Sequence, residues 1–327
     1  MEKIAILIIA HKSPFQLQKL VQSLTDERFV IFIHLDAKSN INEFESLVSN
    51  CIFIQNRHKT YLYSNTLIKA ALSLINSASS NGKYKYFILI SGQDYPIKSN
   101  DVIYNTLTRA YPTSFLESTP VMPETWCQSW GRLNFNQYYR HKLHDVLGNK
   151  WYNSRLGKLF RIPIKIIDLA STPLTGGSPI LKLKKLGFKM AAGSAFWMLP
   201  DTAVKIIKSK IEQCPEIIDI FDHIQAPEEC FFQTILSDTL LASDYPEWID
   251  RSLDTDPLVS RMDREILRFI YDYRDGKSSG HPYNIREVEL DIVLNSQSLF
   301  ARKFDSHQNP NVLKRIEEFR NNVTRNS

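Results

Sequence analysis

The chain has 327 residues, and 43% of them are apolar, 11% aromatic and 23% charged. This composition excludes a disordered chain, a collagen and a coiled coil, and it supplies enough apolar residues for a sizeable core. The 40 Lys and Arg against 35 Asp and Glu leave a net charge of +5, a mild excess that does not choose between nucleic acid, acidic lipid and a phosphorylated substrate. Because a single core rarely grows much beyond about 300 residues, the length predicts two interdependent lobes.

The first hundred residues alternate between two patterns. Three apolar runs bounded by polar turn residues predict buried parallel strands over Ile4–Ala10, Phe29–Leu35 and Tyr86–Ser91. Leu and Ala at helical spacing predict helices over 14–24 and 66–77. The alternation predicts an α/β fold with a mostly parallel central sheet flanked by helices. The first run is far shorter than the roughly 20 residues that span a bilayer, and no signal-peptide cleavage pattern follows it, so a strand is favoured.

The middle of the chain is strongly basic. Residues 140–189 contain eleven Lys and Arg against two acids, Asp145 and Asp168, a local excess of +9. The cations are mixed with Trp151 and with several Leu, Phe and Ile residues. This mixture is typical of a segment that lies on an anionic bilayer, and equally of a solvated basic face on a helical connector. Stacking of the aromatic residues on RNA is a weaker third interpretation.

The second half of the chain shows fewer elements. Its patterns predict a helix over Asp201–Gln213, another that starts near Pro227, and a last one over 311–321. Glycine and proline predict a loop over 274–284.

The cysteines indicate the compartment. Cys51, Cys127, Cys214 and Cys230 are far apart and form no CxxC pair, so neither a zinc site nor a dense disulfide framework is indicated. We therefore expect a cytoplasmic protein, and the basic segment adds the expectation of peripheral contact with the inner face of the cytoplasmic membrane.

Several nucleotide-binding motifs are absent, and the strand ends carry other residues. The sequence has no GxxxxGK[ST] and no GxGxxG after the first strand. The three predicted strands are followed instead by His11, by Asp36 and by the stretch from Ser91 to Asp94. Because ligands of open α/β sheets bind at the carboxyl ends of the strands, we expect these residues to border one crevice. Taken singly, each is also explained as a turn or helix-cap residue.

Six segments, in the right order, resemble the core-2/I-branching enzymes, glycosyltransferase family 14, which includes β-1,6-N-acetylglucosaminyltransferases and peptide O-xylosyltransferases. They are Ile4–Ala10 with His11, Phe32-Ile33-His34-Leu35-Asp36-Ala37-Lys38-Ser39, Leu89-Ile90-Ser91-Gly92-Gln93-Asp94-Tyr95-Pro96-Ile97-Lys98-Ser99, Gly193-Ser194-Ala195-Phe196-Trp197, Pro227-Glu228-Glu229-Cys230-Phe231-Phe232-Gln233-Thr234, and Leu299-Phe300-Ala301-Arg302-Lys303-Phe304-Asp305. The third and the last are the most specific. The sequence shows neither the membrane anchor nor the cysteine-rich domain of animal members, so we expect a compact bacterial-type member of the family.

The resemblance implies a GT-A-like fold, a UDP-sugar donor, and inversion at the anomeric carbon without a metal or other cofactor. Most GT-A enzymes hold a metal with an Asp-x-Asp, and here the corresponding strand end carries Gly92-Gln93-Asp94. A later Asp254-Thr255-Asp256 beside Pro257 favours a turn over a metal site. The alternative is a metal-dependent glycosyl or nucleotidyl transferase that uses Asp94, or Asp254 and Asp256.

The resemblance also implies which cations bind the diphosphate. Lys303 matches the residue that takes the place of the metal, and the adjacent Arg302 adds a second positive charge. A further cation is expected upstream, and four residues are candidates: Arg286, His281, Lys277 and Arg268.

The general base is predicted at Pro227-Glu228-Glu229. Proline suits the first turn of a helix, and the positive end of the helix dipole favours an ionised carboxylate, which a base requires. The family pattern maps the catalytic acid onto Glu229. Because consecutive helical residues point about 100° apart, only one of the two carboxylates faces the reacting sugar hydroxyl; Glu229 is favoured, Glu228 is the alternative base, and Glu228 is otherwise expected to bind the acceptor.

The acceptor is expected to meet Glu117, with Arg132, Arg140 and Trp197 as companions. Trp197 can stack on a sugar face, although an aromatic residue in such an apolar run is more often part of the core. One departure from the family lies at Tyr61-Leu62-Tyr63, where members usually carry a Trp-Gly pair, so contacts to the nucleotide or donor sugar are expected to differ.

Together these features predict three parts: a nucleotide-sugar-binding half over 1–120, an acceptor-side half over 121–250, and a segment over 251–327 that closes the diphosphate site. His11, Asp36, Ser91 and Asp94 are expected to bind the nucleotide and donor. The predicted function is sugar transfer, of GlcNAc, xylose or a similar sugar, to a hydroxyl of a glycan or lipid-linked glycan in surface polysaccharide synthesis. The rival from another class is a non-catalytic protein that binds membrane or nucleic acid through 140–189. The six ordered segments weigh against it, and no nucleic-acid partner is expected.

Overall fold

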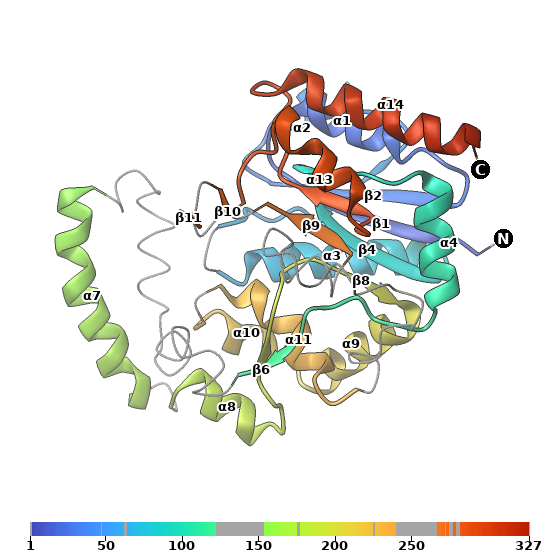
Figure 1. Cartoon of the computed structure of the whole chain (residues 1–327). Coiled ribbons are helices and arrows are strands. Elements are labelled where there is room, and N and C mark those ends of the chain that lie inside the picture. Colours follow the sequence, from blue (N-terminus) through green and yellow to red (C-terminus); the bar gives the residue numbers. More distant parts are fainter. Residues whose placement is uncertain are drawn as a thin grey trace.

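The computed structural model describes residues 2–46, 48–61, 64–121, 154–174, 177–224, 226–239, 267–271, 273–274, 277–278 and 282–326. A central sheet has the strand order β3-β2-β1-β4-β8 (Figure 1). Four of its strands are parallel and the edge strand β8 is antiparallel, which confirms the predicted mostly parallel sheet. The bounds are β1 Ile4–Ala10, β2 Phe29–Leu35, β3 Ile52–Phe53, β4 Tyr86–Ser91 and β8 Trp197–Pro200.

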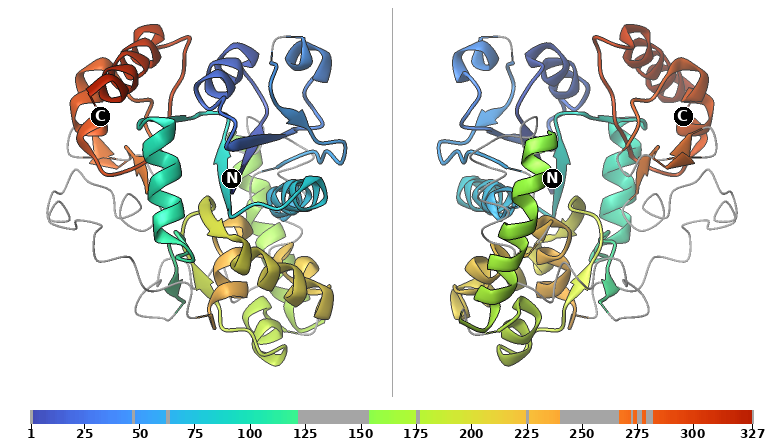
Figure 2. Two further views of the ribbon diagram at one scale, coloured as in Figure 1. Left: turned by 90° about the vertical axis from the view of Figure 1, so that its right-hand side faces the viewer. Right: turned by 90° about the vertical axis from the view of Figure 1, so that its left-hand side faces the viewer.

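Two layers of helices cover the sheet because its central strands are apolar on both faces. Ile4, Ile6 and Ile8 of β1 belong to one hydrophobic cluster, whereas Ala5 and Leu7 belong to the other. The first cluster lies under α1 Pro14–Ser23, α2 Ile41–Glu45, α4 Asn100–Ala110, α13 Leu290–Asn295 and α14 Pro310–Asn326. The second lies against α3 Thr66–Asn81, α9 Asp201–Gln213, α10 Ile217–Phe221 and α11 Phe231–Leu236 (Figure 2).

A second, small sheet joins segments that are far apart in the sequence. Its order is β5-β12-β9, where β5 is Asp94–Pro96, β12 is Phe300–Arg302 and β9 is Arg268–Ile270. β12 is antiparallel to β5, with Arg302 opposite Asp94, and parallel to β9. The two most specific sequence motifs therefore meet in one sheet.

Most predicted elements occur close to their predicted bounds. The three early strands and the helix over Asp201–Gln213 coincide with β1, β2, β4 and α9. The helix predicted near Pro227 begins as a single 3₁₀ turn, η1 Pro227–Glu229, and α11 follows it. The predicted loop over 274–284 contains part of a short antiparallel pair, β10 Tyr273–Arg274 with β11 Lys277–Ser278. The remaining short elements are β6 Thr119–Pro120, β7 Ala191–Ala192 and η4 Glu287–Glu289.

Most of the described part of the basic segment is helical. It forms α7 Arg155–Leu174 and α8 Pro179–Lys185, and residues 140–153 and 175–176 lie outside the described residues. In Figure 1, α7 stands at the left edge of the molecule. Among the described residues, no helix combines the length and the apolar character needed to cross a membrane.

The three parts predicted from the sequence interlock. β8, from the middle part, completes the sheet that β1 to β4 begin. β9 and β12, from the last part, pair with each other, and β12 also pairs with β5 of the first. The division at residues 120 and 250 stays a prediction.

Candidate active site

A cavity of about 730 Å³ opens at the carboxyl ends of β1 and β4. Parallel strands end level with one another there, since Ala10 pairs with Leu35 and Ile9 with Ser91. The wall also includes residues of α3, of η1, of the 192–196 segment and of the small sheet. Seven predicted site residues line it: His11, Asp36, Ser91, Glu117, Glu228, Glu229 and Arg302. The crevice expected at the strand ends is therefore present.

Asp36 secures the loop beside the end of β2. Its carboxylate accepts hydrogen bonds from the backbone N–H of Lys38 at 2.7 Å and of Thr60 at 3.2 Å, and from the Thr60 hydroxyl. The side chain is only 2% exposed. The turn interpretation thus holds for Asp36, which shapes the cavity wall largely through the backbone it fixes.

Cations and one aromatic ring surround this end of the cavity. The Lys38 ammonium lies 4.3 Å from the centre of the Tyr61 ring, and both residues line the wall. Burial, followed by the charge of Lys12, lowers the pKa of His11, so its imidazole is neutral at pH 7. A neutral imidazole offers one donor and one acceptor, which suits a polar ligand edge.

Asp94 is an anchor for two arginines behind the cavity wall. Its two oxygens each accept a hydrogen bond from Arg268 Nη2 at 2.6 Å, and the Ser91 backbone N–H donates to Oδ2 at 2.6 Å. Arg302 Nη1 lies 3.4 Å from Oδ1 and also donates to the Ser91 hydroxyl. Asp94 is fully buried and does not line the cavity. The sequence predicted that Asp94 contacts the nucleotide; in the structure it instead positions two arginines.

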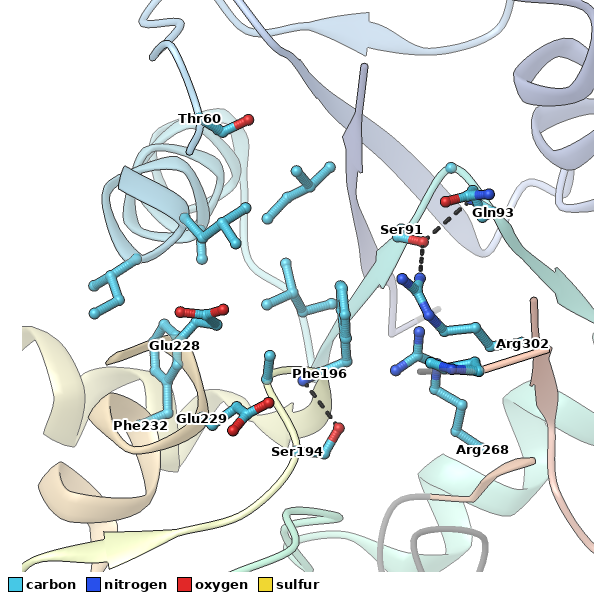
Figure 3. A pocket seen from close by; sticks show the side chains of 18 of the residues that line it. Thr60, Ser91, Gln93, Ser194, Phe196, Glu228, Glu229, Phe232, Arg268 and Arg302 are labelled. Atoms are coloured by element: carbon cyan, nitrogen blue, oxygen red, sulfur yellow. Dashed lines mark hydrogen bonds between the residues drawn. The ribbon is translucent and has the colours of Figure 1, made fainter. Parts of the chain in front are cut away.

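The Phe196 ring supports the same two guanidinium groups. The guanidinium carbons of Arg268 and Arg302 lie 4.2 and 5.3 Å from the ring centre. Burial lowers the pKa of Arg268 to about 10 while the Asp94 charge opposes the shift, so Arg268 stays cationic at neutral pH. Figure 3 shows both guanidinium groups in the cavity wall on the side away from Glu228. Two positive charges are thus held rigidly at one edge of the cavity.

Glu228 and Glu229 occupy the opposite edge, on η1. Pro227 starts this turn, and Ala226 precedes it in the left-handed conformation with φ 54°. Figure 3 shows the two carboxyl groups diverging: Glu229 points toward Ser194, and Glu228 points toward the side on which Thr60 lies. Burial, reinforced by the charge of Glu229, raises the pKa of Glu228 to about 8. One acid of the pair therefore carries a proton at neutral pH.

A close backbone contact joins Glu229 to Glu117. The Gly193 N–H donates to the Glu229 carbonyl at 2.8 Å. A Cβ at Gly193 would lie 2.0 Å from the Glu117 carbonyl oxygen, so only glycine fits there. The Gln233 side chain holds the same segment by donating to the Ser194 carbonyl at 2.6 Å. Glu117 and Glu229 consequently line one wall, although they are far apart in the sequence.

Three predicted site residues do not line the cavity. Asp94 lies behind the wall, as described above. Trp197 is 1% exposed and packs edge-on against Phe232 at 5.1 Å in the core, so it has no surface to offer a sugar, and its predicted acceptor contact is corrected. Lys303 lies outside the wall, and burial together with the charges of Arg302 and Lys12 lowers its pKa. Its part in diphosphate binding stays a prediction.

The candidates for the second cation separate clearly. Arg268 lines the cavity beside Arg302. Arg286 instead forms an ion pair with Glu289 at 2.7 Å in a cap at η4. The side chains of His281 and Lys277 lie outside the described residues, as do Arg132, Arg140, Asp254 and Asp256. Phe196 was missed as a site residue, although it stands inside one of the six matching segments.

The described residues contain no cluster of three or more His, Cys, Asp or Glu side chains suited to a metal ion. Both oxygens of Asp94, one of the carboxylates that the metal-dependent alternative would use, already accept hydrogen bonds from Arg268, and Oδ2 also accepts from the Ser91 N–H.

The fold and the cavity define an α/β protein with a cavity at the carboxyl ends of a mostly parallel sheet, which is where such folds bind ligands. The chain belongs to the Core-2/I-branching enzyme family, whose model matches residues 4–247. This confirms the family that the sequence motifs indicated.

Named relatives lie at low identity over nearly the whole chain. It is 24% identical over 339 residues to mouse β-1,3-galactosyl-O-glycosyl-glycoprotein β-1,6-N-acetylglucosaminyltransferase 4, covering 96% of this chain and 65% of the relative. The zebrafish protein of the same name is 28% identical, with coverage of 96% and 69%. A human β-1,3-galactosyl-O-glycosyl-glycoprotein β-1,6-N-acetylglucosaminyltransferase is 23% identical, with coverage of 92% and 66%. The chain thus spans about two thirds of the length of these relatives.

Proposed function

We propose that the protein is an inverting glycosyltransferase with a GT-A-like fold, which transfers a sugar from a UDP-sugar to a hydroxyl group of a glycan. One observation carries the proposal: two arginines anchored on Asp94 stand at one edge of a cavity at the strand ends, and two glutamates stand at the other. This arrangement places positive charge for a leaving diphosphate and a carboxylate for proton removal in one cavity.

The arginines suit the diphosphate of the donor. A departing UDP gains negative charge as the bond to the anomeric carbon breaks, and guanidinium groups donate paired hydrogen bonds to phosphate oxygens. Arg268 and Arg302 are held by Asp94 and Phe196 before any ligand arrives, so little reorganisation is needed. We propose that this pair, with Lys303 nearby, does the work of the divalent metal in other GT-A enzymes.

Glu229 is the proposed general base. Glu228 holds a proton at neutral pH and is therefore a poor acceptor, whereas Glu229 points into the cavity toward Ser194. As the acceptor oxygen bonds to the anomeric carbon, its proton passes to the Glu229 carboxylate. The carbon–oxygen bond to UDP breaks on the opposite side, and UDP leaves with that electron pair. Attack from the opposite side inverts the configuration at the anomeric carbon.

The remaining wall residues form two groups, one suited to the nucleotide of the donor and one suited to the acceptor sugar. His11, Lys38 and Tyr61 surround the end of the cavity at β1 and β2, where we place the nucleoside and the donor phosphates. Glu117 lies beside Glu229 through the Gly193 contact, where we place the acceptor sugar. We further propose that the acceptor belongs to a surface polysaccharide under assembly in the cytoplasm.

The test is UDP release from a panel of UDP-sugars, with EDTA present throughout. We expect turnover of one donor, unaffected by EDTA, and at least about a thousandfold loss in Glu229→Gln with UDP binding retained. Glu212→Gln, an exposed glutamate on α9, is the matched control and should keep full turnover. Turnover that requires a metal would contradict the role of the arginines and support the metal-dependent alternative.

A binding experiment isolates the diphosphate site. Arg268→Met and Arg302→Met should each weaken UDP binding by about tenfold to hundredfold in calorimetry, because each loses charge-assisted hydrogen bonds. Uridine, which lacks the phosphates, should bind the variants and the parent equally. If the variants bound uridine and UDP with equally weakened affinity, the arginines would not be binding the diphosphate.

A further inference from the structure

Helix α7 presents an apolar surface to solvent. Eight large apolar side chains on it are between 48% and 88% exposed: Leu156, Leu159, Phe160, Ile162, Ile166, Ile167, Leu169 and Leu174. At 100° per residue they fall within about half of the helix circumference. The buried residues Gly157, Asp168 and Thr172 lie on the other half. The helix therefore turns its polar side toward the protein and its apolar side outward, the reverse of an ordinary surface helix.

Among the described residues of α7, the exposed charges are all positive. Arg155, Lys158 and Lys165 are exposed, and the two lysines lie along one edge of the apolar half. The one acid of the helix, Asp168, is 3% exposed. Helix α8 follows with Lys182, Lys184 and Lys185 and has no acid, while Leu181 is 53% exposed. An outward apolar face bordered by cations complements a surface that has an anionic outer layer over an apolar interior.

We infer that α7 docks on an anionic lipid bilayer, lying in the plane of the interface with its apolar half among the acyl chains. Amphipathic helices that bind this way have a broad apolar face and a basic polar edge, whatever their length. The flanking lysines reach anionic headgroups while their aliphatic stems stay with the apolar face. No described helix is suited to cross the membrane, so α7 lies on the surface.

Other occupants fit less well. A second copy of the chain would bring the lysines of one α7 against those of another. Single-stranded nucleic acid needs aromatic side chains for base stacking, and seven of the eight exposed side chains are aliphatic, with Phe160 the exception.

The helix lies on the cavity side of the molecule. β1, β2 and β4 run toward the side on which α7 stands in Figure 1, and α7 is nearest the viewer in the right-hand view of Figure 2. Membrane docking through α7 therefore brings the strand ends and their cavity toward the lipid surface. A lipid-linked glycan at the membrane would be the accessible acceptor, a consequence that rests on the proposed function, whereas the docking itself does not.

Co-sedimentation with vesicles tests the docking and needs no sugar donor. The full chain should sediment with vesicles of equal parts phosphatidylcholine and phosphatidylglycerol, and much less with phosphatidylcholine alone or at high salt. The double variant Lys158→Glu, Lys165→Glu should lose at least about twentyfold in partitioning. Lys205→Glu with Lys314→Glu is the matched control, because both lysines are exposed and lie on α9 and α14, away from α7.

A second variant tests the apolar face. Ile162→Ser with Ile166→Ser keeps every charge and changes only exposed side chains, so circular dichroism should be unchanged while partitioning falls by about tenfold or more. Absence of binding to the anionic vesicles overturns the inference, as does an equal loss in the control variant. Sedimentation equilibrium showing a dimer that the two serines dissociate would also overturn it, because the face would then belong to a second copy.

Discussion

The protonated carboxyl of Glu228 makes a prediction about stability. Its pKa is about 8 in the folded protein, against 4.5 for an ordinary glutamate, because burial and Glu229 disfavour the charge. Between these pH values the folded chain keeps a proton that the unfolded chain has released. The free energy of unfolding therefore falls as pH rises from about 4.5 to about 8. Glu228→Gln, which keeps the shape of the neutral acid, removes this dependence.

The magnitude follows from the shift. A difference of about 3.5 pKa units at 1.36 kcal/mol each gives about 5 kcal/mol at pH 8 and above. The cavity admits water to part of the Glu228 side chain while Oε2 is fully enclosed, so about 5 kcal/mol is an upper bound. We expect roughly half of it, about 2 to 3 kcal/mol, after partial solvation.

Urea unfolding followed by circular dichroism, at several pH values between about 5 and about 8, measures this. The free energy of unfolding of Glu228→Gln should equal that of the parent near pH 5 and should be about 2 to 3 kcal/mol higher near pH 8. Titrating groups that do not interact with Glu228 are common to both proteins, so their contributions cancel in the difference, whereas the interaction of Glu229 with Glu228 is part of the effect that is measured. Glu318→Gln on α14, where the glutamate is 60% exposed, controls for the substitution itself. A constant difference across the pH range refutes the buried-acid reasoning, and abolished sugar transfer in Glu228→Gln would make Glu228 the base.

Two further substitutions test how the site is held. Asp94→Asn leaves the guanidinium of Arg268, which is 2% exposed, without its counter-charge, so the free energy of unfolding measured with urea should fall by about 3 to 5 kcal/mol. Adding Arg268→Met to this variant should restore part of that stability. A loss below about 1 kcal/mol would contradict the role of Asp94 as an anchor. Gly193→Ala places a Cβ against the Glu117 carbonyl. We therefore expect thermal unfolding to show a free energy of unfolding that is lower by about 1 to 3 kcal/mol, together with weaker acceptor binding. Gly82→Ala, whose nearest contact is an ordinary 3.5 Å, should stay near the parent, and equal behaviour of the two alanine variants would dismiss the clash.

Local patterns predicted the central part of the fold well. β1, β2 and β4 are fully apolar runs, and hydrophobic runs bounded by turn residues form buried parallel strands with little help from the rest of the chain. Parallel strands put their carboxyl ends at one edge, so His11, Asp36 and Ser91 were correctly expected around one crevice. The matched motifs correctly indicated the family.

Contacts between distant segments could not be predicted in the same way. The position of Trp197 illustrates this, because its apolar neighbours favour the core without excluding a tryptophan that faces a cavity. Packing of this β8 residue against Phe232, which lies on α11, decides that it is buried. The outward apolar half of α7 is a similar case, since the basic pattern of the sequence says nothing about which side the body of the protein covers.

The sequence by itself determined the alternating α/β order, the edge of the sheet that carries the site, and the identity of the acids on η1. The α/β order and the strand ends depend on neighbouring residues, and hydrophobic periodicity encodes them directly, whereas the acids on η1 were indicated by the resemblance to the family. Only the tertiary structure decided that Arg268 joins Arg302 on Asp94, because that depends on the pairing of β9 with β12 and of β12 with β5. Strand pairing between remote segments is set by packing of the whole chain, and no local pattern records which of several cations it brings to the cavity.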